Sequence, residues 1–102
     1  MTTGSIDLAA TIYLPSIYGG KVNDPDIAVG METADISGAT AWALEYAFEQ
    51  EGTWFPALDS SGTAITGTLA TIHLLYAEAK LGMLWRVKFA AGSTGTVSYT
   101  YL

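Results

Sequence analysis

Apolar and polar side chains alternate with a period of two along most of this chain. In the segment "AWALEYAFEQ", four large apolar side chains fall on one side of an extended strand: Trp42, Leu44, Tyr46 and Phe48. Read as a helix, the same segment would place glutamates within its apolar stripe. A β-strand separates the two kinds of side chain completely, so the spacing predicts a strand here.

The same alternation predicts four further strands. They cover residues 6–14, residues 27–31 with a kinked continuation to 36, residues 83–89 and residues 97–101. The first is expected to end at Pro15, because proline cannot donate a ladder hydrogen bond. The last two are joined by "AGSTG", whose glycines allow the positive φ of a tight hairpin loop.

Residues 69–82 fit two descriptions. "LATIHLL" alternates as a strand does, whereas "LLYAEAKLG" contains helix formers followed by a glycine. One short helical turn around residues 74–82 therefore stays open as an alternative to a strand.

The overall prediction is an all-β chain. A length of 102 residues supplies one hydrophobic core, so residues 1–102 are expected to form a single domain. Short strands separated by Gly, Pro, Asp and Ser turns favour a single-domain antiparallel β-sandwich, of jelly-roll or Ig-like type.

The composition predicts more apolar surface than a small domain can bury. Half of the residues are apolar and the aromatic residues comprise 3 Trp, 6 Tyr and 3 Phe. Because a small fold leaves much of its surface in contact with water, we expect an oligomer or a docking surface.

Several classes of function are disfavoured by charge and composition. The net charge of −6 repels nucleic acid, and the lack of cysteine removes disulfides and thiolate metal sites. No apolar run approaches the ~20 residues of a membrane span, and "MTTGSID" lacks the features of a signal peptide. We therefore expect synthesis in a cytoplasm, with no membrane or nucleic-acid partner.

No group of residues in the sequence indicates an enzyme. His73 is the only histidine and has no nucleophile at a suggestive spacing, so a structural or surface role is favoured. Glu45, Glu49 and Glu51 resemble a glycosidase carboxylate set only superficially, because alternation places charge on the solvent face of such a strand. We expect no catalytic residues and no cofactor.

Two oxygen-rich turns contain ligands of the kind that calcium accepts. They contain Asn23, Asp24 and Asp26 in one case, and Asp59, Ser60 and Ser61 in the other. Neither has the spacing of an EF-hand, and the same residues are ordinary turn formers. The prediction is that no metal is bound.

The tryptophans divide into two groups. Trp42 and Trp85 belong to unbroken apolar faces, which predicts core packing. Trp54 and Phe55 follow the "QEG" turn and could stack on a sugar ring or anchor a partner protein. Core and surface roles stay open for Trp54.

The last two thirds of the chain resemble small virion proteins of tailed bacteriophages. The matching stretches are "LEYAFEQEGTWFPALDSSG" and "LWRVKFAAGSTGTVSYTYL", in particular residues 51–54, Trp85 with Arg86, and residues 95–99. Such proteins are typically β-sandwich or jelly-roll modules that act as capsid decoration (cement), head-fibre, neck or tail components.

The resemblance implies a non-enzymatic capsid decoration protein. It would bind the major capsid protein on the outer surface of the head, often as a homotrimer, after assembly in the host bacterial cytoplasm. From the residues, the candidate interface comprises Tyr13, Ile17 and Tyr18, beside a Gly/Pro-rich loop, with Trp54 and Phe55. The alternatives are a carbohydrate- or receptor-binding module, for which Trp54, Phe55, Tyr13 and Tyr18 would be a stacking platform, and a neck or tail subunit.

Overall fold

The computed structural model describes residues 2–18, 26–37, 41–49, 51–68, 72–78 and 83–101. Within these ranges the chain forms strands and turns, and no helix. The strands are β1 (Thr2–Asp7), β2 (Ile17–Tyr18), β3 (Asp26–Ser37), β4 (Ala41–Ala47), β5 (Phe55–Pro56), β6 (Thr66–Thr68), β7 (Ile72–Glu78), β8 (Leu84–Phe89) and β9 (Thr94–Tyr101).

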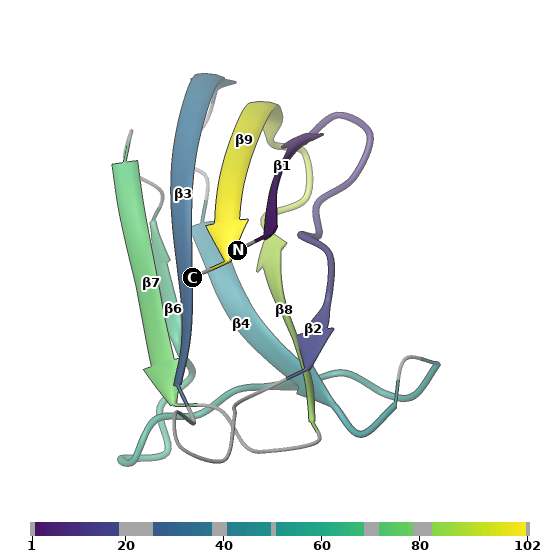
Figure 1. The fold of residues 1–102 in the computed structure, drawn as a ribbon, viewed down its shortest axis with the longest axis vertical. Helices are drawn as coiled ribbons and strands as arrows, with labels where there is room; N and C mark the ends of the chain where they lie inside the picture. Colours follow the sequence, from purple (N-terminus) through teal and green to yellow (C-terminus); the bar gives the residue numbers. More distant parts are fainter. Residues whose placement is uncertain are drawn as a thin grey trace.

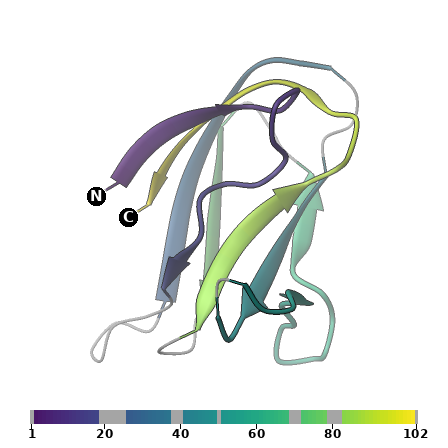
Figure 2. The same ribbon diagram turned by 90° about the vertical axis from the view of Figure 1, so that its right-hand side faces the viewer.

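The strands form two antiparallel sheets that face each other (Figures 1 and 2). One sheet has the order β1-β9-β3-β7. The other has the order β2-β8-β4-β5. β6 pairs with the same edge of β4 as β5 does, but nearer the start of that strand. This arrangement confirms the predicted single-domain β-sandwich.

Alternation correctly predicted β3, β4, β8 and β9 as strands. β4 pairs with β8 so that Trp42 lies opposite Phe89 and Leu44 opposite Val87. All four of these side chains are buried. β3 extends past Met31 as predicted, and its pairing with β9 becomes irregular between Ala34 and Ser37, which corresponds to the expected kink.

The predicted first strand over residues 6–14 is wrong in its extent. β1 ends at Asp7, whose side-chain Oδ1 accepts a hydrogen bond from Ala9 N at 3.0 Å and whose carbonyl accepts from Ala10 N at 2.9 Å. The chain turns there and crosses to the other sheet, where Ile12 O accepts from Phe89 N at 2.7 Å. Leu8 N still donates to Gly95 O of β9 at 2.9 Å, and the local bonds to Asp7 take the place of ladder bonds beyond Leu8.

The predicted hairpin between the last two strands is also wrong. β8 and β9 belong to different sheets, so the segment that joins them passes from one layer to the other. Its glycines do have the expected backbone conformation, with φ of 84° at Gly92 and 113° at Gly95. Ser93 Oγ closes the turn by donating to Ala90 O at 2.8 Å.

Residues 69–82, for which a strand and a helical turn are both open from sequence, form a strand where the structure describes them. β7 covers Ile72–Glu78 and pairs along its whole length with β3. This excludes the helical turn over residues 74–78, whereas residues 79–82 lie outside the described residues. The turns expected at "YGG", "NDPD" and "SGA" lie mostly outside them as well, because residues 19–25 and 38–40 are not described.

The core fills the space between the two sheets. Its largest fully buried side chains come from both layers and from the crossing segment: Phe89, Leu14, Met31, Leu44, Leu75, Val29, Val87 and Val97. Trp42 and Trp85 are 7% and 6% exposed, which confirms their predicted core positions. Burial of these apolar side chains is the main favourable contribution to stability.

Candidate interaction surface

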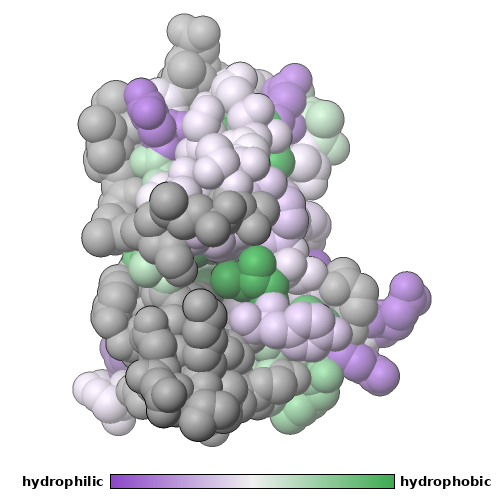
Figure 3. Space-filling model, in the orientation of Figure 1, coloured by the Kyte–Doolittle hydropathy of each residue, from purple (hydrophilic) through white to green (hydrophobic). Residues whose placement is uncertain are grey.

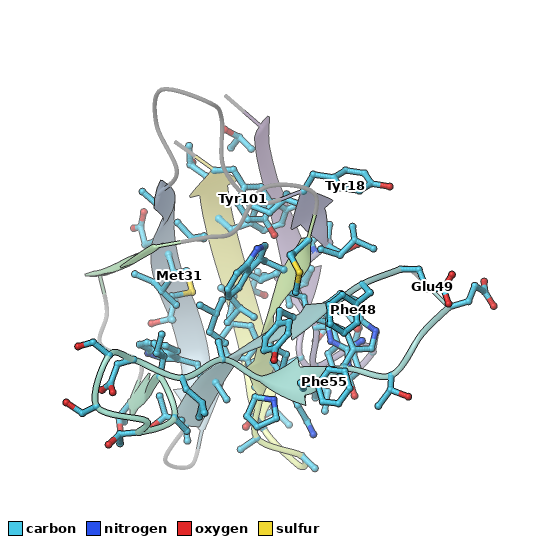
Figure 4. The ribbon with its side chains drawn as sticks, turned by 90° about the horizontal axis from the view of Figure 1, so that it is seen from below. Tyr18, Met31, Phe48, Glu49, Phe55 and Tyr101 are labelled. Atoms are coloured by element: carbon cyan, nitrogen blue, oxygen red, sulfur yellow. The ribbon has the colours of Figure 1, made fainter. Side chains whose placement is uncertain are left out.

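An aromatic cluster lies where β4 ends and β5 begins. Phe55 is paired with Tyr46 across the two strands, and their ring centroids are 5.6 Å apart. The Phe48 ring meets Phe55 at 6.1 Å and Tyr46 at 6.3 Å, both at edge-on angles. Figure 4 shows Phe48 and Phe55 side by side. We call Tyr46, Phe48 and Phe55 the aromatic patch.

Phe48 was expected on the inner face of β4, and this is wrong. The strand ends at Ala47, so the alternation stops one residue before Phe48. Phe48 is 71% exposed and Phe55 is 38% exposed. Tyr46 is half-buried because its other side lies against the core residue Trp85, with ring centroids 5.6 Å apart. The patch is therefore an outward continuation of the core.

The loop after Phe48 carries two exposed carboxylates within three residues of the patch. Gly52 N donates to Glu49 O at 3.0 Å and closes a turn in which both Glu49 and Glu51 are exposed. Glu49 lies beyond Phe48 in Figure 4, on the part of the loop that projects from the molecule. Where this loop projects in Figure 1, the surface in Figure 3 is hydrophilic.

Arg86 organises the outer face of the same sheet. Its Nε donates to Glu45 Oε1 at 2.8 Å, and the two side chains are only 19% and 16% exposed. Its Cζ also lies 4.0 Å from the ring centroid of Tyr13 and 4.0 Å from that of Trp54. We call Arg86, Glu45, Tyr13 and Trp54 the arginine cluster. A guanidinium suits this place because it stacks on rings and forms directed hydrogen bonds together.

Glu45 was expected to be solvated, and this is wrong. Alternation correctly places it on the outer face of β4, but the pairing of Glu45 with Arg86 across the sheet turns that position into a half-buried ion pair. The partner is 41 residues away in sequence, so spacing along the chain gave no sign of it.

The five predicted interface residues fall into three places. Tyr13 and Trp54 meet at Arg86, whereas Phe55 belongs to the aromatic patch. Ile17 is paired with Trp85 and packs against the core. Tyr18, the next residue in β2, is 74% exposed. Most of the Gly/Pro-rich loop after Tyr18 lies outside the described residues.

A shallow groove lies at the opposite end of the sandwich from the aromatic patch. It is lined by residues 8–13 and 91–94, the two segments that cross between the sheets. These lining residues are mainly small or apolar. None of these lining residues carries a charged side chain.

The residues considered for metal binding are not assembled into a site in the described part of the chain. There, no three His, Cys, Asp or Glu residues come together in a way that could hold a metal ion. Asp59 Oδ1 instead accepts from Ser61 N at 2.8 Å and from Thr63 N at 3.0 Å, as turn-forming aspartates do. Asn23 and Asp24 lie outside the described residues, and so do the side chains of Asp26 and His73.

No helix in the described residues has the length and apolar character needed to cross a bilayer. Comparison with known proteins gives no relative: no family model, no curated protein and no solved structure matches the chain.

Proposed function

We propose that the chain is a non-enzymatic structural protein of a tailed-bacteriophage virion, a capsid decoration protein that cements the head. Its partner is the major capsid protein, and its place is the outer capsid surface after assembly in the bacterial cytoplasm. The observation that carries the proposal is the aromatic patch, in which Phe48 is 71% exposed directly after the end of β4. The sequence resemblance supports the virion assignment.

The aromatic patch suits docking because it is exposed and also held in place. Tyr46 and Phe55 are fixed by strand pairing, and Tyr46 is anchored on Trp85. An aromatic side chain that is already ordered loses little conformational entropy when a partner covers it. Full burial of one such side chain is worth about 1.5–3 kcal/mol, gross.

Cementing requires only binding across neighbouring capsomers. Each copy adds a modest free energy that is specific for the assembled shell, and many copies act on one head. As part of the proposal the protein forms a homotrimer, which would present three aromatic patches to the shell. Simultaneous engagement of three patches raises the overall affinity without new contacts within each patch.

The test is to mix the purified protein with empty heads of the phage that encodes it. We expect the protein to sediment with the heads and to raise the temperature, or the chelator concentration, at which they open. Phe48→Ser should reduce both effects. Leu58→Ser, at another exposed apolar side chain, is the matched control and should behave as the unchanged protein.

Two outcomes would contradict the proposal. One is failure to bind heads combined with glycan binding on an array, which would favour a carbohydrate-binding module. In that case Tyr13 and Trp54 would have to use ring surface that Arg86 leaves free. The other is an image of the intact particle that places the chain in the neck or tail.

A further inference from the structure

The charge around the aromatic patch is one-sided. Residues 41–68, which contain the whole patch, include four carboxylates and no lysine or arginine: Glu45, Glu49, Glu51 and Asp59. Glu49 and Glu51 are exposed within a few residues of Phe48. Because Glu45 is paired with Arg86 and Asp59 belongs to another turn, the negative charge close to the exposed patch comes from Glu49 and Glu51.

In the described structure, the cation nearest to this region is Arg86, and its charge is already engaged in an ion pair. Arg86 is ion-paired with Glu45 at 2.8 Å and stacked on two rings, so it does not offset Glu49 or Glu51. Lys88 lies farther along β8, opposite Ala43. Lys21 and Lys80 lie outside the described residues.

The same charges disfavour a second copy of the chain as the occupant of the patch. A two-fold contact would place each copy's patch against its equivalent and bring Glu49 and Glu51 of both copies together. Like charges that face each other across an interface weaken binding and suppress the wrong partner. A two-fold dimer would then use another surface.

We infer that the aromatic patch binds a protein surface that presents an apolar recess bordered by lysine or arginine side chains. Phe48 and Phe55 fill the recess, and Glu49 and Glu51 face the basic border. This inference rests on the proposed function, because it describes the part of the capsid surface that the protein would contact.

The experiment uses a defined probe, an amphipathic helical peptide with leucines on one face and lysines on the other. A matched peptide carries glutamate in place of each lysine. We expect the full chain to bind the lysine peptide, more weakly as salt is added, and not the glutamate peptide. Phe48→Ser should weaken binding roughly tenfold, and Glu49→Gln about threefold.

Two control variants separate the patch from general charge and hydrophobicity. Glu32→Gln removes one exposed carboxylate from β3, in the other sheet, and Leu58→Ser removes one exposed apolar side chain. Both should leave binding unchanged. If Glu32→Gln weakens binding as much as Glu49→Gln does, or if the glutamate peptide binds equally well, the inference is wrong.

Head binding distinguishes this inference from the proposed function. If the protein binds heads and neither Phe48→Ser nor Glu49→Gln affects this binding, the inference fails and the proposed function stands. If the patch variants weaken peptide binding while the unchanged protein ignores heads, the proposed function fails and the inference stands. Thermal unfolding of every variant shows whether it is folded.

Discussion

Gly67 illustrates how one residue can determine the position of a core side chain. It pairs with Trp42 across β4 and β6, and the indole lies directly over it. A Cβ atom at position 67 would lie 2.7 Å from Trp42 Cζ2. Because Trp42 is 7% exposed, its ring has little room to move away.

We therefore expect Gly67→Ala to lower the free energy of unfolding by about 1–3 kcal/mol, the usual cost of overpacking. Urea denaturation measures this change. Gly30→Ala is the control, because the nearest atom to its added Cβ would be Thr100 O at an ordinary 3.9 Å. Equal effects of the two substitutions would show that the contact with Trp42 is unimportant.

Tyr101 links stability to alkaline pH. Its hydroxyl donates to Pro15 O, and burial, together with the charge of nearby Tyr99, raises its pKa above the ordinary value. The folded protein therefore holds this proton more tightly than the unfolded chain. The resulting stability is present at neutral pH and is lost as the pH rises above about 10, where an unfolded tyrosine ionises.

Tyr101→Phe should reduce this alkaline loss. At neutral pH it should cost about 1 kcal/mol, because the hydrogen bond to Pro15 is removed. Urea denaturation at increasing pH, up to about 11, compares the variant with the unchanged protein. An equally steep alkaline decline in both proteins would assign the effect to other groups.

At the scale of elements, the arginine cluster joins three separate parts of the chain to one sheet. Tyr13 belongs to the segment that crosses between sheets, Trp54 to the loop before β5, and Arg86 to β8. Arg86→Met should cost about 2–3 kcal/mol, because it leaves Glu45 half-buried without its partner and removes the stacking.

The matched control for Arg86→Met is Lys88→Met, two residues along the same face of β8. It should change stability by no more than about 0.5 kcal/mol. Arg86→Lys should fall between the two, because lysine keeps the charge but loses the planar stacking surface. Denaturant unfolding of the three variants gives the order, and similar values for all three would contradict a structural role of the cluster.

The elements also show which features can be predicted from sequence. Alternation was sufficient to predict β4, β8 and β9 as strands and to predict that Trp42 and Trp85 are buried. Side-chain direction in a strand is a local property. Leu8 and Leu14 fall on one face of the alternation over residues 6–14 and are both buried, whereas Ala10 on that face is exposed because the chain turns there. Local patterns therefore identified most of the core.

Features that depend on contacts between distant segments could not be predicted in this way. The turn at Asp7 and the crossing between β8 and β9 depend on which sheet each strand joins. The exposure of Phe48 depends on where β4 stops pairing, and the pairing of Glu45 with Arg86 depends on strand register. Periodicity along the chain contains none of this information.

At the scale of the whole molecule, the proposed trimer leads to a direct prediction. Sedimentation equilibrium should give a mass three times that of the 10.8 kDa chain. Phe48→Ser should leave this mass unchanged, because the proposal assigns the patch to the contact with the shell and not to the contact between copies. A monomer would contradict the trimer, and loss of the trimer in Phe48→Ser would instead place the patch between copies.

The pairing of β1 with β9 also has a mechanical consequence. Thr2 lies opposite Tyr101 at one end of this antiparallel ladder. Tension applied between these two residues would break the β1–β9 hydrogen bonds one after another, starting from this end, and would require little force. Tension along β3, which is bonded to β7 on one side and to β9 on the other, would strain many bonds at once. The domain would therefore be weak under load in one direction and strong in another.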